Sequence, residues 1–256
     1  MNHSQVSKSD AVVEVLNAEG SAPVVLVCEH ASNHIPDRFE HLGLTVAART
    51  SHAAWDPGAL AVAENMSQQL AAPLVASRVS RLVYDCNRPP DAADAMPARS
   101  EVIDVPRNAG LTDAQRAERI KAFYAPFKAA VTRTLDAKTD PTLVTVHSFT
   151  PVYHGVPRSV EIGLLHDTDT RLTDAMLSCA AAHTACVVER NAPYGPQDGV
   201  THTLKEHALP YKRPNVMIEI RNDLIATATA QNEMAKTLSA WLTDAMAKTD
   251  TVQCKG

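Results

Sequence analysis

The stretch Pro23-Val-Val-Leu-Val-Cys28, followed directly by Glu29-His30, decides the expected fold. A continuous, β-branched apolar run of this length is typical of a strand that is buried on both faces of a sheet. Polar residues begin where this strand should end, and α/β sheets carry their sites at the carboxyl ends of their strands. We therefore expect an α/β protein with chemical groups at the end of this strand.

Short apolar runs and longer helical patterns alternate along the rest of the chain. Further strands are predicted at 73–76, 82–84, 142–146, 160–165, 186–189 and 215–220. Helices are predicted at 58–71, 113–135, 169–185 and 227–248, the second of them capped by Thr112 or Asp113. This alternation indicates an α/β fold of three layers, α/β/α, around a central mixed, mostly parallel sheet of the phosphorylase/hydrolase-like kind. Residues 89–110 carry few periodic apolar positions, and we expect a long surface loop of the type that often forms an active-site lid.

The composition is that of a globular protein. The chain has 256 residues, of which 45% are hydrophobic and 21% charged. We expect residues 1–256 to form a single domain, with its core between about 20 and 250. The formal net charge of -5 gives no support to a nucleic-acid partner, which normally requires a basic face.

Other classes are disfavoured by the termini and the cysteines. Residues 1–10 are polar and lack the apolar segment of a secretory signal, and no apolar run approaches the ~20 residues that span a bilayer. The five cysteines are odd in number and include no C-x-x-C pair, which argues against a disulfide framework and a thiolate zinc site. We expect a cytoplasmic enzyme that acts on a small molecule, without a membrane partner; the sequence does not predict its oligomeric state.

Polar side chains gather where several predicted strands end. His30 and His147 each follow such a strand, Glu219 closes another, and Asp56 precedes the first predicted helix. Two neutral imidazoles and one carboxylate form a common catalytic zinc shell that leaves a position for water. A second carboxylate that is not bound to the metal can then take a proton from that water. This edge of the sheet is therefore the predicted active site.

Five motifs resemble those of the N-formylglutamate amidohydrolase family, and they are distributed from about residue 24 to 225. They are Cys28-Glu-His-Ala-Ser-Asn-His-Ile-Pro36, Asp85-Cys-Asn-Arg88, Val146-His-Ser-Phe-Thr-Pro151, Asn191-Ala-Pro-Tyr194 and Ile218-Glu-Ile-Arg221. That family is distantly similar to zinc carboxypeptidases and to the aspartoacylase and succinylglutamate desuccinylase group. The resemblance implies that His30 and His147 hold Zn²⁺ or another divalent metal, and that Glu219 is the general base. It also implies that Asn87 and Arg88 bind a substrate carboxylate.

The third metal ligand departs from the pattern of these relatives. They usually have a Glu three residues after the first His, whereas this chain has Asn33, a poor zinc ligand. Asp56 is the first choice, because it precedes a predicted helix at the same edge. Glu29 is the second choice, because its side chain should point away from that of His30 if the strand continues.

Further residues are expected around the substrate. Arg158 precedes the 160–165 strand and is predicted to serve a second carboxylate or the oxyanion. Arg221 lies two residues after Glu219, on the same face of a regular strand, where it would support Glu219 or bind substrate. The turn-rich segment 191–207 is expected to line the pocket, with hydrogen bonds from residues in the set Asn191, Tyr194, Thr201, His202 and His207.

Several of these residues also have a purely structural explanation. Asp56 is a suitable cap for a helix that begins at Pro57 or Gly58. Glu219 can be an ion-pair partner of Arg221 or Arg88, and Tyr194 can serve packing alone.

The function expected from the sequence is metal-dependent hydrolysis of the C–N amide bond of an N-acyl acidic amino acid. The resemblance alone implies N-formyl-L-glutamate as the substrate, with formate and L-glutamate as products. The alternatives are a carboxypeptidase-like or other N-acyl amino acid deacylase, and a non-catalytic small-molecule binding protein on the same fold. A role in histidine catabolism or in another pathway is left open.

Overall fold

The computed structural model describes residues 11–253, so the polar segment 1–10 and Cys254 lie outside the described residues. A seven-stranded sheet forms the centre, in the order β1-β3-β2-β6-β11-β9-β10. Four neighbouring pairs are parallel, and the pairs β1–β3 and β11–β9 are antiparallel. The strands are β1 (Val13–Leu16), β2 (Val24–Cys28), β3 (Leu74–Ser77), β6 (Thr142–Phe149), β9 (Ile162–Leu165), β10 (Val188–Arg190) and β11 (Asn215–Arg221).

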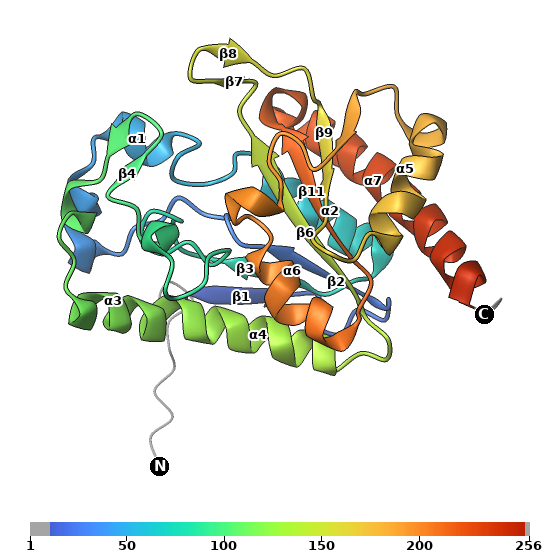
Figure 1. Ribbon diagram of the computed structural model, residues 1–256, viewed down its shortest axis with the longest axis horizontal. Helices are drawn as coiled ribbons and strands as arrows, with labels where there is room; N and C mark the ends of the chain where they lie inside the picture. Colours follow the sequence, from blue (N-terminus) through green and yellow to red (C-terminus); the bar gives the residue numbers. More distant parts are fainter. Residues whose placement is uncertain (1–10, 254–256) are drawn as a thin grey trace.

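Helices cover both faces of this sheet, which confirms the predicted three-layer α/β fold (Figure 1). One face packs against α2 (Ala59–Leu70), α5 (Arg171–His183) and α7 (Ala228–Gln253). The other face packs against α4 (Ala125–Asp136) and α6 (His202–His207). No helix in the described part of the chain is long and apolar enough to cross a membrane.

Strand β2 shows why the opening apolar run forms the middle of the sheet. Its five residues are all buried. Val24, Leu26 and Cys28 belong to the core under α2, α5 and α7, whereas Val25 and Val27 belong to the core under α4 and α6. Successive side chains of a strand point to opposite faces, so a strand with apolar residues at every position supplies both cores.

Most predicted elements are present with shifted ends, and one predicted strand is absent. Residues 82–84 form a buried turn, although their apolar character suggested a strand. The carbonyl oxygen of Ser80 accepts hydrogen bonds from the backbone N–H groups of Val83 and Tyr84, and its hydroxyl accepts one from Leu82. The backbone groups are thereby satisfied without a neighbouring strand.

The predicted loop at 89–110 contains short regular pieces. The strands β4 (Arg99–Ser100) and β5 (Ile103–Asp104) pair with each other, and 3₁₀ turns lie at Ala93–Ala95 and Pro106–Asn108. A second small hairpin, β7 (Val152–Tyr153) and β8 (Val156–Pro157), was not predicted and projects beyond the end of the central sheet (Figure 1). Residues of both hairpins line the pocket described below.

The helix predicted at 113–135 consists of three consecutive pieces. These are α3 (Asp113–Arg119), a π-helical turn (Ile120–Tyr124) and α4. Of the two predicted caps, Thr112 is the one observed, and it forms a capping box with Gln115. The remaining pieces are α1 (Val46–Thr50) and 3₁₀ segments at Asp37–Gly43, Pro196–Asp198, Leu209–Tyr211 and Asn222–Ile225.

Candidate active site

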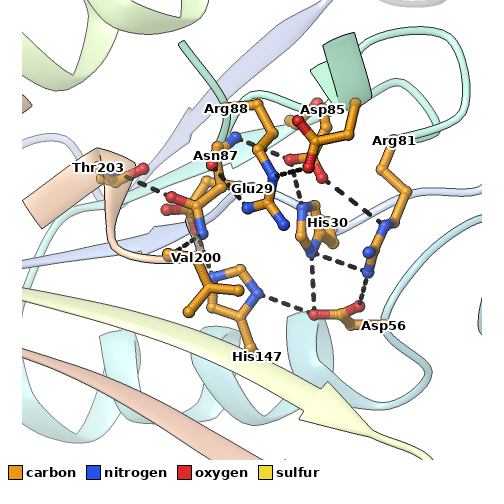
Figure 2. Close-up of polar contacts among 12 residues, drawn as sticks. Glu29, His30, Asp56, Arg81, Asp85, Asn87, Arg88, His147, Val200 and Thr203 are labelled. Carbon is orange, nitrogen blue, oxygen red and sulfur yellow. Dashed lines mark hydrogen bonds and ion pairs between the residues drawn. The ribbon is translucent and has the colours of Figure 1, made fainter. Parts of the chain in front are cut away.

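Three separate segments bring His30, Asp56 and His147 together at the carboxyl ends of the central strands. His30 follows β2, His147 lies on the neighbouring strand β6, and Asp56 precedes α2. The strand β6 runs on to Phe149, so His147 lies inside it and not after its end as predicted. Oδ2 of Asp56 lies 3.2 Å from Nδ1 of His30 and 2.9 Å from Nδ1 of His147 (Figure 2).

This group has the donor set and the convergence that a divalent metal requires. The three residues are buried, and one ligand atom from each lies within 4.8 Å of the others. Two imidazole nitrogens and one carboxylate oxygen match a common three-residue zinc shell. Among the candidates for the third ligand, Asp56 belongs to this group and Asn33 does not. The side chain of Asn33 donates to the backbone oxygen of Arg49. The residues present therefore fit a zinc-type ion, and Asp56 is the carboxylate that converges with the two histidines.

Asp56 does not cap the helix that follows it. The N-cap of α2 is Gly58, and no side chain caps this helix. Oδ2 of Asp56 instead accepts a hydrogen bond from the backbone N–H of Ser148, and its Oδ1 accepts one from Arg81. Burial alone would raise the pKa of Asp56, but the neighbouring His30 and His147 lower it well below its usual range. The carboxylate is thus held ionised between the two imidazoles.

A second pair of carboxylates lies behind the histidines. Oδ1 of Asp85 is 2.7 Å from Nε2 of His30, and Oε2 of Glu29 is 3.0 Å from Nε2 of His147. Burial would lower the pKa of both imidazoles. The charges of Asp85 and Asp56 outweigh it at His30, whose pKa is raised, and those of Glu29 and Asp56 raise the pKa of His147 well above its usual value. Each imidazole therefore faces Asp56 with one nitrogen and a buried carboxylate with the other.

Glu219 is a buried carboxyl group beside this cluster. It lies on β11 directly opposite His147 of β6. Its Oε2 has no hydrogen-bond partner, and burial raises its pKa to about 7. Ion pairing with Arg221 or Arg88 is not its role here, because these arginines pair with Asp223 and Asp94, respectively. A carboxyl group that gains and loses a proton near neutral pH is suited to general acid–base chemistry.

A cavity of about 460 Å³ opens onto the cluster. This volume is in the range of small-molecule sites. Its lining is mostly polar and includes His30, Asp56, Arg81, Asn87, Arg88, Ser148, Arg158 and Tyr194, with His52, Ser100, Glu101 and Tyr153 from the surrounding loops. Three arginines in one small cavity indicate an anionic ligand.

Arg158 is the arginine in this cavity that lacks an acidic partner among the side chains that the structure describes. Its Nη2 donates to the hydroxyl of Tyr194 at 3.0 Å, and its Nη1 donates to the backbone oxygen of Thr150. The guanidinium also lies over the rings of Tyr153 and Tyr194, at 4.5 and 4.8 Å from their centroids. Tyr194 thus lies at the cavity as predicted, where it positions a cation.

Asn87 and Arg88 lie at the cavity but are already engaged with protein groups. The side chain of Asn87 donates to the backbone oxygen of Val200 and accepts from the N–H of Thr203. Arg88 pairs with Asp94 through Nε and donates to the backbone oxygen of Gly199 through Nη1. Both residues therefore fasten the 198–203 segment to the site.

Five residues that were predicted around the substrate do not line the cavity. The side chain of Asn191 accepts from the N–H of His166, and Arg221 pairs with Glu161 and Asp223. His207 is buried on α6, where its nearest polar partner is the hydroxyl of Thr132, and burial lowers its pKa to about 4. Thr201 and His202 bond to Asp167 and Tyr124, respectively. Proximity along the 191–207 segment therefore did not predict proximity in space.

Sequence reasoning missed Arg81, which lies at the centre of the site. Its Nη1 is 3.3 Å from Oδ1 of Asp56 and 3.4 Å from Nδ1 of His30. The turn that begins at Arg81 directs the side chains of Arg81 and Asp85 toward His30 (Figure 2). The sequence carried a signal for Asp85, which stands in a quoted motif, but Arg81 preceded an expected strand and stood in no motif.

Comparisons with known proteins give a consistent result. The family model for N-formylglutamate amidohydrolase matches residues 22–226. The solved structure of gene product Atu2144 from Agrobacterium tumefaciens is 51% identical, with a TM-score of 0.92 over 94% of this chain and 97% of that chain. The structure of N-formylglutamate amidohydrolase from Ralstonia eutropha JMP134 is 20% identical and has a TM-score of 0.68 over 96% of this chain and 100% of that chain, a likeness of fold. A search of curated proteins gave no significant match.

Proposed function

This chain belongs to the N-formylglutamate amidohydrolase family, and we propose that it hydrolyses N-formyl-L-glutamate to formate and L-glutamate in a zinc-dependent reaction. Membership of this family supports an enzyme that cleaves an amide bond. The observation that carries the metal-dependent part of the proposal is the convergence of His30, Asp56 and His147 beside the buried Glu219. A non-catalytic binding protein would have no need for such a group.

His30, Asp56 and His147 would hold the ion. When bound there, zinc supplies Lewis acidity that polarises a carbonyl oxygen and makes a nearby water more acidic. The N–H of Ser148 and the guanidinium of Arg81 bond to Asp56 and keep its carboxylate in place. The protein thus provides a preorganised, largely buried ligand set.

Glu219 is the proposed proton carrier. In amide hydrolysis, the attacking water loses a proton and the leaving amine nitrogen gains one. Glu219 takes the first proton and delivers the second, so the carboxylate is regenerated at the end of the cycle. Its burial favours this role, because burial raises its pKa to about 7 and makes both protonation states accessible.

Arg81 is the proposed partner for the negative charge that develops on the formyl oxygen. It lies within 3.4 Å of His30 and lines the cavity. A fixed cation at the point where charge develops stabilises the transition state more than the ground state. The guanidinium of Arg81 already lies at the position that this role requires.

Arg158 is the proposed receptor for a substrate carboxylate. It is a cation in the cavity without a carboxylate partner among the described side chains, and Tyr194 and Thr150 hold its orientation. Arg88 still has Nη2 for a second carboxylate, since that nitrogen has only a 3.5 Å contact to the backbone oxygen of Asp198. Arg221 takes a positioning role, because it donates to the backbone oxygen of Arg158.

A panel of N-acyl amino acids tests the substrate. The zinc-loaded protein should release formate from N-formyl-L-glutamate with a higher kcat/KM than it shows for N-acetyl- or N-succinyl-L-glutamate or for N-formyl-L-leucine. Cleavage of a longer acyl group without cleavage of N-formyl-L-glutamate would identify another deacylase. Binding without turnover of any member would identify a binding protein.

An arginine variant tests how the substrate is recognised. Arg158→Met should raise KM with a smaller change in kcat, because it removes a contact that is present before and during the reaction. Arg78→Met is the matched control, since Arg78 pairs with Glu14 at the sheet edge and does not line the cavity. An equal KM for Arg158→Met and the wild type would remove Arg158 from substrate recognition.

A further inference from the structure

The two histidines of the cluster have the same arrangement of neighbours, although they come from different strands. Each presents Nδ1 to Asp56 and Nε2 to a separate buried carboxylate. For His30 that carboxylate is Asp85, and for His147 it is Glu29 (Figure 2). Asp85 hydrogen-bonds Nε2 of His30, whereas Glu29 lies at ion-pair distance from Nε2 of His147 without a hydrogen bond. In both pairs a buried carboxylate faces the outer nitrogen of a ring, which indicates a shared purpose.

Glu29 is the member of this set whose role the proposed function does not use. It follows β2 directly and precedes His30 in the chain, yet its side chain points to His147 of the neighbouring strand. Glu29 faces Nε2 of His147 and Asp56 faces Nδ1, so the imidazole lies between the two carboxylates. Glu29 is not one of the three residues whose ligand atoms converge.

We infer that Glu29 is a positioning residue for the metal centre: its carboxylate accepts the Nε2 proton of His147 and so fixes Nδ1 as the ligand atom. This inference rests on the metal site of the proposed function. A neutral imidazole carries its proton on one nitrogen and binds a metal through the other. A carboxylate on the outer nitrogen sets that choice, holds the ring plane and makes the ligand nitrogen more basic.

The burial of Glu29 supports this assignment over a structural ion pair at the surface. Glu29 is 1% exposed, and the side chain of His147 is equally covered. The burial of a carboxylate is unfavourable unless a partner compensates for it. Nε2 of His147, at 3.0 Å, is the partner that Glu29 has, and through this imidazole the carboxylate would act on the metal.

The test is zinc affinity, measured by competition with a chelator on wild type, Glu29→Gln and Asp85→Asn. Each substitution keeps the size of the side chain and removes one outer charge, and each should weaken zinc binding about 10- to 100-fold. Glu206→Gln is the matched control, because Glu206 pairs with Lys128 on the surface of α6, and its zinc affinity should equal that of the wild type. Thermal unfolding of the metal-free proteins shows that each variant is folded.

Two spectroscopic measurements separate positioning from direct ligation. In the zinc-loaded wild type, ¹⁵N NMR of the histidine rings should show the proton of His147 on Nε2 and the metal on Nδ1. In the cobalt-substituted Glu29→Gln variant, the absorption bands should keep the positions that they have in the wild type. A metal on Nε2, shifted cobalt bands or an unchanged zinc affinity in Glu29→Gln would each overturn the inference.

These measurements use no substrate, so they are separate from the test of the reaction. A chain that binds zinc in a Glu29-dependent manner and leaves N-formyl-L-glutamate intact contradicts the proposed substrate and supports the role of Glu29. A wild-type chain without measurable zinc affinity overturns both the metal site and this inference.

Discussion

His147 and His207 are both almost completely buried, with exposed fractions of 1% and 5%, but their surroundings are opposite. His147 lies between the carboxylates of Glu29 and Asp56, and despite burial its pKa is raised well above the usual value. Within residues 11–253, the hydroxyl of Thr132 is the side-chain group that hydrogen-bonds Nδ1 of His207, and burial lowers the pKa of His207 to about 4. Burial alone thus does not make a histidine a candidate ligand, and the carboxylates around His147 distinguish it from His207. The following experiments compare the two regions.

The largest difference should be seen between two glutamates. Glu219→Gln in the site should lower kcat by ~10²–10⁴, because the proton carrier is lost, and should leave zinc content unchanged. Glu206→Gln, next to His207 in the chain, should retain wild-type kcat. Steady-state kinetics on zinc-loaded proteins measures both. Equal turnover in the two variants would mean that Glu219 takes no part in proton transfer.

A smaller difference is expected between two arginines. Arg81→Met should reduce kcat by ~10²–10³, since it removes a cation from the position where negative charge develops. Arg213 donates to the backbone oxygen of His207 and pairs with Asp136, so Arg213→Met should lower stability without a comparable loss of kcat. The comparison fails if the two substitutions reduce kcat to the same extent.

The smallest effect concerns stability and its pH dependence. His207 has a pKa of about 4 in the folded protein and of ~6.5 in the unfolded chain. Below pH 6.5 the unfolded chain therefore binds more protons, and the stability present at pH 7 is lost as the pH falls toward 4. From pH 7 to pH 5 the wild type should lose about 2 kcal/mol more than His207→Gln. Urea unfolding at both pH values measures this difference, and parallel losses would show that His207 does not titrate in this way.

The fold was largely predictable because its signals are local. The apolar run at 23–28, the strand at 215–220 and the cap at Thr112 depend on neighbours in sequence, and the structure confirms them. The strand predicted at 82–84 was wrong because Ser80 satisfies the backbone of that segment locally. Apolar character predicts burial there, and burial does not require a strand.

The site was predictable only in part because it is assembled from distant segments. Strand ends and motifs pointed to His30, Asp56, His147 and Glu219, which the structure brings together. Arg81 was missed because its direction depends on a turn. His207 and Asn191 were predicted in the pocket because they share a segment with Tyr194, but the chain turns them toward Thr132 and His166.

The central claim is that His30, Asp56 and His147 form a zinc centre that amide hydrolysis requires. It is tested most directly by zinc content and hydrolysis of N-formyl-L-glutamate in the wild type, Asp56→Asn and His207→Gln, purified in parallel. The account predicts that the wild type and His207→Gln bind zinc equally and are active, whereas Asp56→Asn loses both zinc and activity. Full zinc content and full activity in Asp56→Asn would contradict it.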